Sequence, residues 1–168
     1  MAITAQDVKA LREMTGVGMM DCKKALAAAD GDKDKAIEWL REKGLAAQTK
    51  KAGKIAAEGV AYAIVDESGV GVVIEVNSQT DFVAKNEVFQ DFVNNLAAIV
   101  AKENPADVAA LQECKYPGED RTVANVLADK VLSIGENIQI RRFVRYAEGV
   151  NVPYIHAGGK VGVLVNME

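Results

Sequence analysis

The 168-residue sequence is poor in the residues that build metal centres and disulfide frameworks. It has two cysteines, Cys22 and Cys114, and one histidine, His156. The cysteines lie far apart and form no C-x-x-C pair, whereas a structural zinc site needs a full set of Cys and His ligands. We therefore expect two reduced thiols of the kind usual in cytosolic proteins, and neither a disulfide nor a metal site.

Excess positive charge and long apolar runs are absent as well. Lys and Arg number 20 against 24 Asp and Glu, which gives a formal net charge of -4. Nucleic-acid binding depends on clustered positive charge, so this balance argues against a nucleic-acid partner. No apolar stretch approaches the roughly 20 residues of a membrane-spanning helix, and residues 1–4 lack the basic and apolar regions of a signal peptide. We expect a cytoplasmic protein that binds neither membranes nor nucleic acid directly.

Catalytic and nucleotide-binding motifs are missing too. Gly69-x-Gly71 lacks the third glycine and the helix of a dinucleotide fingerprint, and Gly158-Gly159-Lys160 lacks the spacing and hydroxyl residue of a P-loop. No G-x-S-x-G elbow is present. We therefore predict no catalytic residues and no cofactor. A small cytosolic enzyme using Asp81 and His156 remains an alternative, because active sites assemble from residues that are distant in sequence.

What the sequence does have is 49% apolar residues, which is enough for a packed core in one domain or two small ones. Helical periodicity dominates up to residue 45, an Ala-, Gly- and Lys-rich stretch follows, and strand-like alternation begins at residue 60. We predict a three-helix domain over 1–45, a linker over 46–59 and an α+β domain over 60–168. The second domain is expected to hold a small, mostly antiparallel sheet with helices on one face.

Capping residues set the expected helix limits in the first domain. Thr4, with Asp7 three residues further on, forms a variant of the capping box, and Gly16 marks the end of the first helix. Asp32 is expected to cap the third helix and Gly44 to end it. A unit this small buries only a modest core, so we expect it to be marginally stable unless it is docked.

Strand and helix signals alternate in the second domain. Alternation with a period of two begins at Val60 and, after a turn, predicts a β-hairpin. Asn86 and Thr122 are the expected starts of two helices. The last strand is expected to run from Tyr154 to Val165, with Gly158-Gly159 at a bend or bulge.

Two features of the pattern allow more than one interpretation. Met19, Met20 and Trp39 do not all fit the inner stripes of the short helices, and methionine serves both in cores and at adaptable binding surfaces. The polar connector from Asn77 to Lys85 carries Phe82 at its centre. That ring either folds back onto the sheet, as most phenylalanines do, or anchors a protruding loop to a partner.

Four blocks, in this order and across nearly the whole chain, resemble the bacterial elongation factor Ts family. They are residues 15–26, residues 75–77 with 80–83, residues 134–138 with Arg141-Arg142, and residues 156–165. The resemblance implies a three-helix, ubiquitin-associated-like domain followed by a core domain. In the longer family members the core has two related halves, and this chain stops after what looks like the first half.

The resemblance also implies a function in protein biosynthesis and a partner. The chain would bind elongation factor Tu carrying GDP, dislodge its Mg²⁺ and promote GDP release, acting by binding and without covalent chemistry. Four residues would dislodge the Mg²⁺: Thr80, Asp81, Phe82 and Val83. Eight further residues would bind the partner: Arg12, Met19, Met20, Lys23, Lys51, Ile134, Gly135 and His156.

Two alternatives remain within this picture. Because the chain matches only the first half of the core, it could dock elongation factor Tu without driving exchange. His156 could be a structural histidine whose hydrogen bonds are satisfied within the fold, instead of a residue that faces the phosphate-binding loop of the partner.

Overall fold

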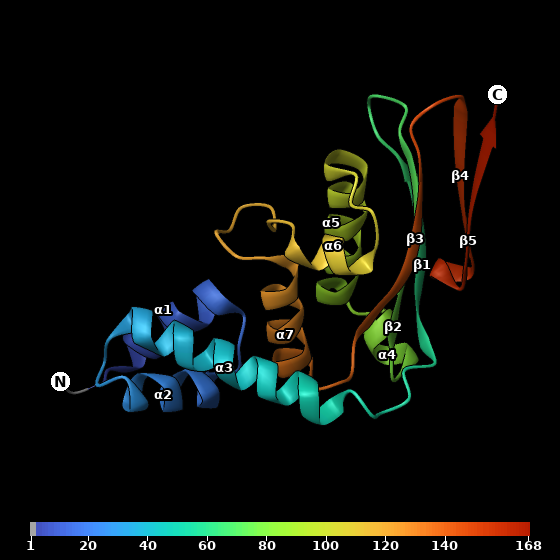
Figure 1. The fold of residues 1–168 in the computed structure, drawn as a ribbon. Helices are drawn as coiled ribbons and strands as arrows, with labels where there is room; N and C mark the ends of the chain where they lie inside the picture. The colour runs from blue at the N-terminus through green and yellow to red at the C-terminus, as the bar shows by residue number, and fades with distance from the viewer. Residues whose placement is uncertain (1–2) are drawn as a thin grey trace. The chain divides into compact units, whose positions relative to one another are not determined.

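The computed structural model describes residues 3–168, whose contacts form two compact units. The first unit comprises Met1–Gly53 and Asn125–Glu136, and the second comprises Lys54–Ala124 and Asn137–Glu168. Figure 1 follows the chain from the helices at its blue end to the paired strands at its red end. The predicted α+β class is confirmed, because N-terminal helices are followed by antiparallel sheets that pack with helices.

Three helices form most of the first unit: α1 (Ala5–Thr15), α2 (Met19–Ala28) and α3 (Lys33–Lys51). Their apolar faces surround a small core, which comprises Val8, Leu11, Val17, Cys22, Ala25, Leu26, Ala36 and Leu40. The unit also contains most of helix α7 (Val123–Ile134), whose Leu132 packs against this core. A segment that is remote in sequence therefore completes a core built mainly by the first three helices.

The predicted helix caps of this unit are confirmed. The Thr4 hydroxyl accepts a hydrogen bond from the Asp7 amide at 3.2 Å, and the Asp7 carboxylate accepts one from the Thr4 amide at 3.0 Å. Gly16 follows α1 in the left-handed conformation, with φ of 67°. The Asp32 carboxylate caps α3 by accepting from the Lys35 amide at 3.1 Å. Each cap satisfies backbone groups that the helix itself leaves unpaired.

The prediction that Gly44 ends the third helix is wrong, because α3 continues through it to Lys51. Gly44 is buried, and a Cβ atom at this position would lie 3.1 Å from the backbone oxygen of Ala128 on α7. The glycine therefore allows a close helix contact instead of stopping a helix. Consequently the first part of the predicted linker, up to Lys51, is helical.

The second unit is built on a three-stranded antiparallel sheet. Its strands are β1 (Glu58–Val65), β2 (Gly71–Ser78) and β3 (Gln139–Tyr146), in that order across the sheet. Helix α5 (Glu87–Glu103) packs against β1 and β2 through its apolar stripe. It is capped as predicted by Asn86, whose side chain accepts from the Val88 amide at 2.9 Å. Two shorter helices flank it, α4 (Asp81–Ala84) and α6 (Val108–Glu113).

The prediction of one strand from Tyr154 to Val165 is wrong, because the chain reverses within that range. Strand β4 (Val150–His156) and strand β5 (Val161–Met167) form an antiparallel hairpin around the 3₁₀ turn η1 (Ala157–Gly159). Gly158 and Gly159 have φ of 66° and 93°, which glycine adopts without strain, and they reverse the chain instead of bending a strand. Figure 1 shows the three-stranded sheet between α5 and this hairpin.

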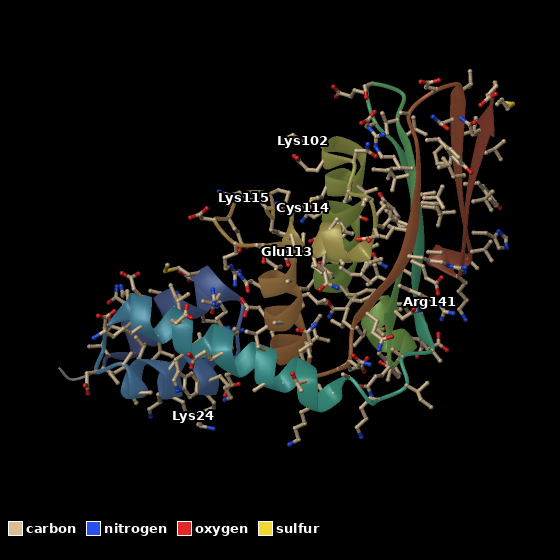
Figure 2. The ribbon with its side chains drawn as sticks, viewed as in Figure 1. Lys24, Lys102, Glu113, Cys114, Lys115 and Arg141 are labelled. Atoms are coloured by element: carbon tan, nitrogen blue, oxygen red, sulfur yellow. The ribbon has the colours of Figure 1, made fainter. Side chains whose placement is uncertain are left out.

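Both cysteines are free thiols, as predicted. Cys22 is buried in the first unit, where its thiol donates to the Val17 carbonyl at 3.5 Å. Cys114 follows α6 and is partly buried (Figure 2). Burial raises the pKa of both thiols, so both favour the protonated, unreactive form. Within residues 3–168, no helix is both long enough and apolar enough to cross a membrane.

The Gly44 contact gives a direct test of the first unit. Gly44→Val should lower the free energy of unfolding by about 1–3 kcal/mol, because the added side chain overpacks the contact with Ala128. Ala46→Val on the same helix is the control, since Ala46 is exposed and only the helix propensity changes there. Urea unfolding measures both. Equal destabilisation of the two variants would contradict the close contact.

Candidate partner-binding site

Phe82 is held away from the protein by a short helix. The chain leaves β2 at Ser78, and Thr80 then caps α4 by accepting a hydrogen bond from the Val83 amide at 3.4 Å. Ala84 faces inward and is buried, whereas the Phe82 side chain is 81% exposed. The interpretation that Phe82 folds back onto the sheet is therefore wrong. The predicted exposure of the ring is confirmed, although a helical turn carries it and not an irregular loop, and its role as an anchor stays a prediction.

Polar contacts hold both ends of α4, the helix that carries this ring. Asp81 forms an ion pair with Lys85 one turn later, at 2.8 Å. The Gln90 side chain of α5 donates to the Ala84 carbonyl at 3.3 Å and so satisfies the end of α4. The hydrogen bond and charge of Lys85 lower the pKa of Asp81, and the charge of Lys160 adds a smaller effect in the same direction. Asp81 is therefore a carboxylate at neutral pH.

His156 lies on an element that packs against the same strand as α4. It ends β4 directly before η1, and both α4 and η1 contact β1. The imidazole is exposed, and its Nδ1 atom lies 2.8 Å from the Tyr154 hydroxyl. Its position is therefore that of a surface histidine with one tyrosine neighbour. Within residues 3–168 no group of three or more His, Cys, Asp or Glu side chains could hold a metal ion.

In the first unit, four of the predicted contact residues lie around the junction of α1 and α2. Arg12 is in the last turn of α1, and its charge acts on the Cys22 thiol of α2. The Met19 and Met20 side chains, in the first turn of α2, are 44% and 67% exposed, and Lys23 is exposed as well. Met19 and Met20 are therefore surface residues, and the cations Arg12 and Lys23 lie at the same helix junction.

Trp39 behaves differently from the two methionines. Its side chain is half-buried against the core of the first unit. The Lys43 ammonium lies 5.0 Å from the centre of its ring, which is within the range of a cation–π contact. Trp39 is therefore explained by packing, whereas Met19 and Met20 are exposed.

The remaining predicted contact residues lie together in the first unit. Lys51, the last residue of α3, donates a hydrogen bond from its ammonium to the Gly135 carbonyl. Gly135 follows α7 with φ of 85°, and Ile134 ends that helix with a partly exposed side chain. The structure therefore brings residues 51, 134 and 135 to one place.

Several polar contacts in the second unit are not indicated by the sequence. Arg142 of β3 pairs with Glu75 of β2 at 2.7 Å, and its neighbour Arg141, labelled in Figure 2, lies 3.8 Å from the same carboxylate. The backbone amide of Asn137 donates a hydrogen bond to the side-chain oxygen of Gln79, although 58 residues separate them. Nothing in the local pattern could identify that second pair, because neither residue stands at a capping or turn position that demands it.

The ion pair on α4 predicts a measurable titration. The folded-state pKa of Asp81 lies below its usual value of 3.8, so the pair stabilises α4 above that pH and is lost as the pH falls through the lowered value. Lys85→Gln should raise the pKa of Asp81, as followed by NMR titration of the carboxyl carbon. Lys102→Gln, which removes an exposed cation from α5, is the control. An unchanged Asp81 titration in Lys85→Gln would contradict the ion pair.

Comparison with known proteins places this geometry in a family. The profile of the family described as "Elongation factor TS" matches residues 79–168, just over half of the chain. Proteins named elongation factor Ts are 51% identical in Syntrophotalea carbinolica, 53% in Trichlorobacter lovleyi and 52% in Clostridium kluyveri. The alignments cover 100%, 98% and 99% of this chain and 56%, 54% and 56% of those proteins, so the chain spans about half of their length. The chain belongs to the elongation factor Ts family.

Proposed function

We propose that this chain is a guanine-nucleotide exchange factor that binds elongation factor Tu carrying GDP, displaces its Mg²⁺ and so promotes GDP release. The observation that carries the proposal is Phe82, a large apolar side chain that α4 holds almost fully exposed. An exposed aromatic ring on a fixed backbone is the kind of anchor that dominates interfaces. In this proposal the chain acts by binding and needs neither catalytic residues nor a cofactor of its own.

Exchange by binding has a thermodynamic requirement. A GTPase holds its nucleotide through backbone amides at a helix N-terminus and through a bound Mg²⁺. A factor that lowers the affinity for the nucleotide must lose affinity for the nucleotide-bound partner by the same ratio. The chain therefore needs enough interface energy to hold the partner in its open state, from which GTP later displaces it.

We propose that the α4 segment displaces the Mg²⁺ of the partner. Phe82 would insert between helices of the partner, and burial of a phenylalanine contributes about 1.5–3 kcal/mol. The carboxylate of Asp81 would enter beside it, and Thr80 and Val83 would set the direction of the turn. Displacement of the partner's helices would distort the Mg²⁺ site, which is sensitive because Mg²⁺ demands near-ideal octahedral geometry.

The remaining residues would dock the partner without acting on the nucleotide site. In the proposal a domain of residues 1–45 binds through the exposed junction of α1 and α2, with Arg12, Met19, Met20 and Lys23. A linker over 46–59 joins it to the core domain of residues 60–168. Lys51, Ile134, Gly135 and His156 would make further contacts.

One other function is favoured by a specific observation. The chain spans about half the length of its relatives, and so it could bind elongation factor Tu without opening the nucleotide site. This docking-only function shares the same surface with the main proposal. Release of fluorescent GDP from elongation factor Tu at fixed Mg²⁺ concentration separates the two functions.

The exposed Phe82 ring gives a direct test of the proposal. The chain should accelerate GDP release, and Phe82→Ala should reduce the acceleration at saturating chain by at least tenfold, because removal of the anchor forfeits about 1.5–3 kcal/mol of interface energy. The free energy of unfolding of the Phe82→Ala variant should differ from that of the unmodified chain by less than about 0.5 kcal/mol, since the ring is exposed. Ile55→Ala is the matched control, because Ile55 is 83% exposed and lies outside the proposed contact set. Equal loss in both variants would refute the role of Phe82.

A substitution at the junction of α1 and α2 separates docking from exchange. Met20→Ala should raise the chain concentration needed for half-maximal GDP release about three- to tenfold, because a side chain that is 67% exposed in the free chain becomes buried on docking. The maximal rate should not change, since the α4 segment is intact. A titration of chain against labelled elongation factor Tu measures both quantities. A lower maximal rate with unchanged half-saturation would contradict a docking role.

A further inference from the structure

A cluster of buried polar residues lies directly behind the segment that carries Phe82. Among residues 3–168 only four polar or charged residues are classed as buried, and three of them are Asn77, Ser78 and Asn137. Asn77 and Ser78 end strand β2, whose preceding inward positions are apolar. Burial of polar groups is costly unless their hydrogen bonds are made. Because three of them lie close to one another, we ask which backbone groups their hydrogen bonds hold in place.

Every one of these side chains has a partner. The Asn77 amide donates to the Glu58 carbonyl and to the Glu75 carboxylate, each at 3.2 Å. The Ser78 hydroxyl donates to the Thr80 carbonyl at 3.0 Å, which is the residue that caps α4. A satisfied buried network of this kind fixes one backbone arrangement, because any other arrangement leaves polar groups unpaired.

Gln79 connects this network to two other parts of the second unit. Its side-chain oxygen accepts a hydrogen bond from the backbone amide of Asn137 at 2.8 Å. The Asn137 side chain in turn donates to the Lys54 carbonyl at 2.7 Å and is 2% exposed. Three segments that are distant in sequence thus meet at the residue directly before Thr80 and α4.

We propose that Gln79 is a positioning residue for exchange: its hydrogen bond to the Asn137 amide fixes the direction in which α4 presents Phe82. The proposal rests on the proposed function of Phe82. A four-residue helix has no stability of its own, so its orientation depends on the connections at its ends. Anchoring a binding group before the encounter removes the entropic cost of ordering it in the complex.

Two substitutions isolate this hydrogen bond. Gln79→Met keeps the length of the side chain but removes both the acceptor oxygen and the NH2 donor, whereas Gln79→Glu removes the donor and keeps an acceptor oxygen, so the difference between the two variants reports on the acceptor. Gln112→Met is the control, because it makes the same change on α6, at a partly exposed position outside this network. None of the three alters Phe82 or its neighbours on α4.

Hydrogen exchange of the free chain provides a readout that does not depend on activity. In Gln79→Met the amides of residues 82–86 should exchange about five- to tenfold faster, which corresponds to the loss of one partly buried hydrogen bond. Exchange in α5 should not change. Gln79→Glu should restore the slow exchange, and Gln112→Met should leave it unaltered. Unchanged exchange of residues 82–86 in Gln79→Met would overturn the proposal.

GDP release then tests the link to function. Gln79→Met should lower the maximal rate of release from elongation factor Tu about five- to tenfold with little change in thermal stability, and Gln79→Glu should recover it. If Phe82→Ala slows GDP release from elongation factor Tu while Gln79→Met promotes it at the normal rate, the positioning role is wrong. The proposed function then still stands. If the unmodified chain does not accelerate GDP release from elongation factor Tu, the proposed function fails. A positioning role in exchange then fails with it, whatever the hydrogen-exchange result.

Discussion

The attachment of a single helical turn to a sheet is the constraint on which this account depends. Helix α4 has four residues and cannot persist alone, because helix nucleation is unfavourable. It is held by the Thr80 cap at its start, by Gln90 at its end and by packing of Ala84 against the interior. With Ala84 inside, the helical spacing directs Phe82 outward. The sheet and α5 therefore serve as a rigid support for one exposed ring.

Much of the fold could be predicted because its signals are local. The capping box at Thr4 and the Asn86 cap each involve residues within one helical turn, and the structure confirms both. The two errors in the fold have different causes. Gly44 packs against Ala128, 84 residues away, so the same residue that often ends a helix here lies within one. The strand expected over 154–165 reverses at η1, because two successive glycines with positive φ turn the chain back instead of bending it.

The candidate site was less predictable from residues alone. The pattern around Phe82 fitted both a buried and an exposed ring, and only the family resemblance favoured exposure, which the structure confirms. The contact between Gln79 and Asn137 joins residues 58 positions apart, and no periodicity or cap in the sequence indicates it. The exposure of Met20 could be predicted in part. The amphipathic pattern shows that this side chain does not fit the core, but it does not show which partner binds it.

In the proposed function, the chain favours the nucleotide-free state of elongation factor Tu through Phe82. Isothermal titration calorimetry against nucleotide-free and GDP-bound elongation factor Tu tests it most directly. We expect tighter binding to the nucleotide-free form, by the same factor by which the chain weakens GDP binding, and a smaller ratio for Phe82→Ala. Equal affinity for the two forms would contradict it, because a ligand that does not distinguish two states cannot shift the balance between them.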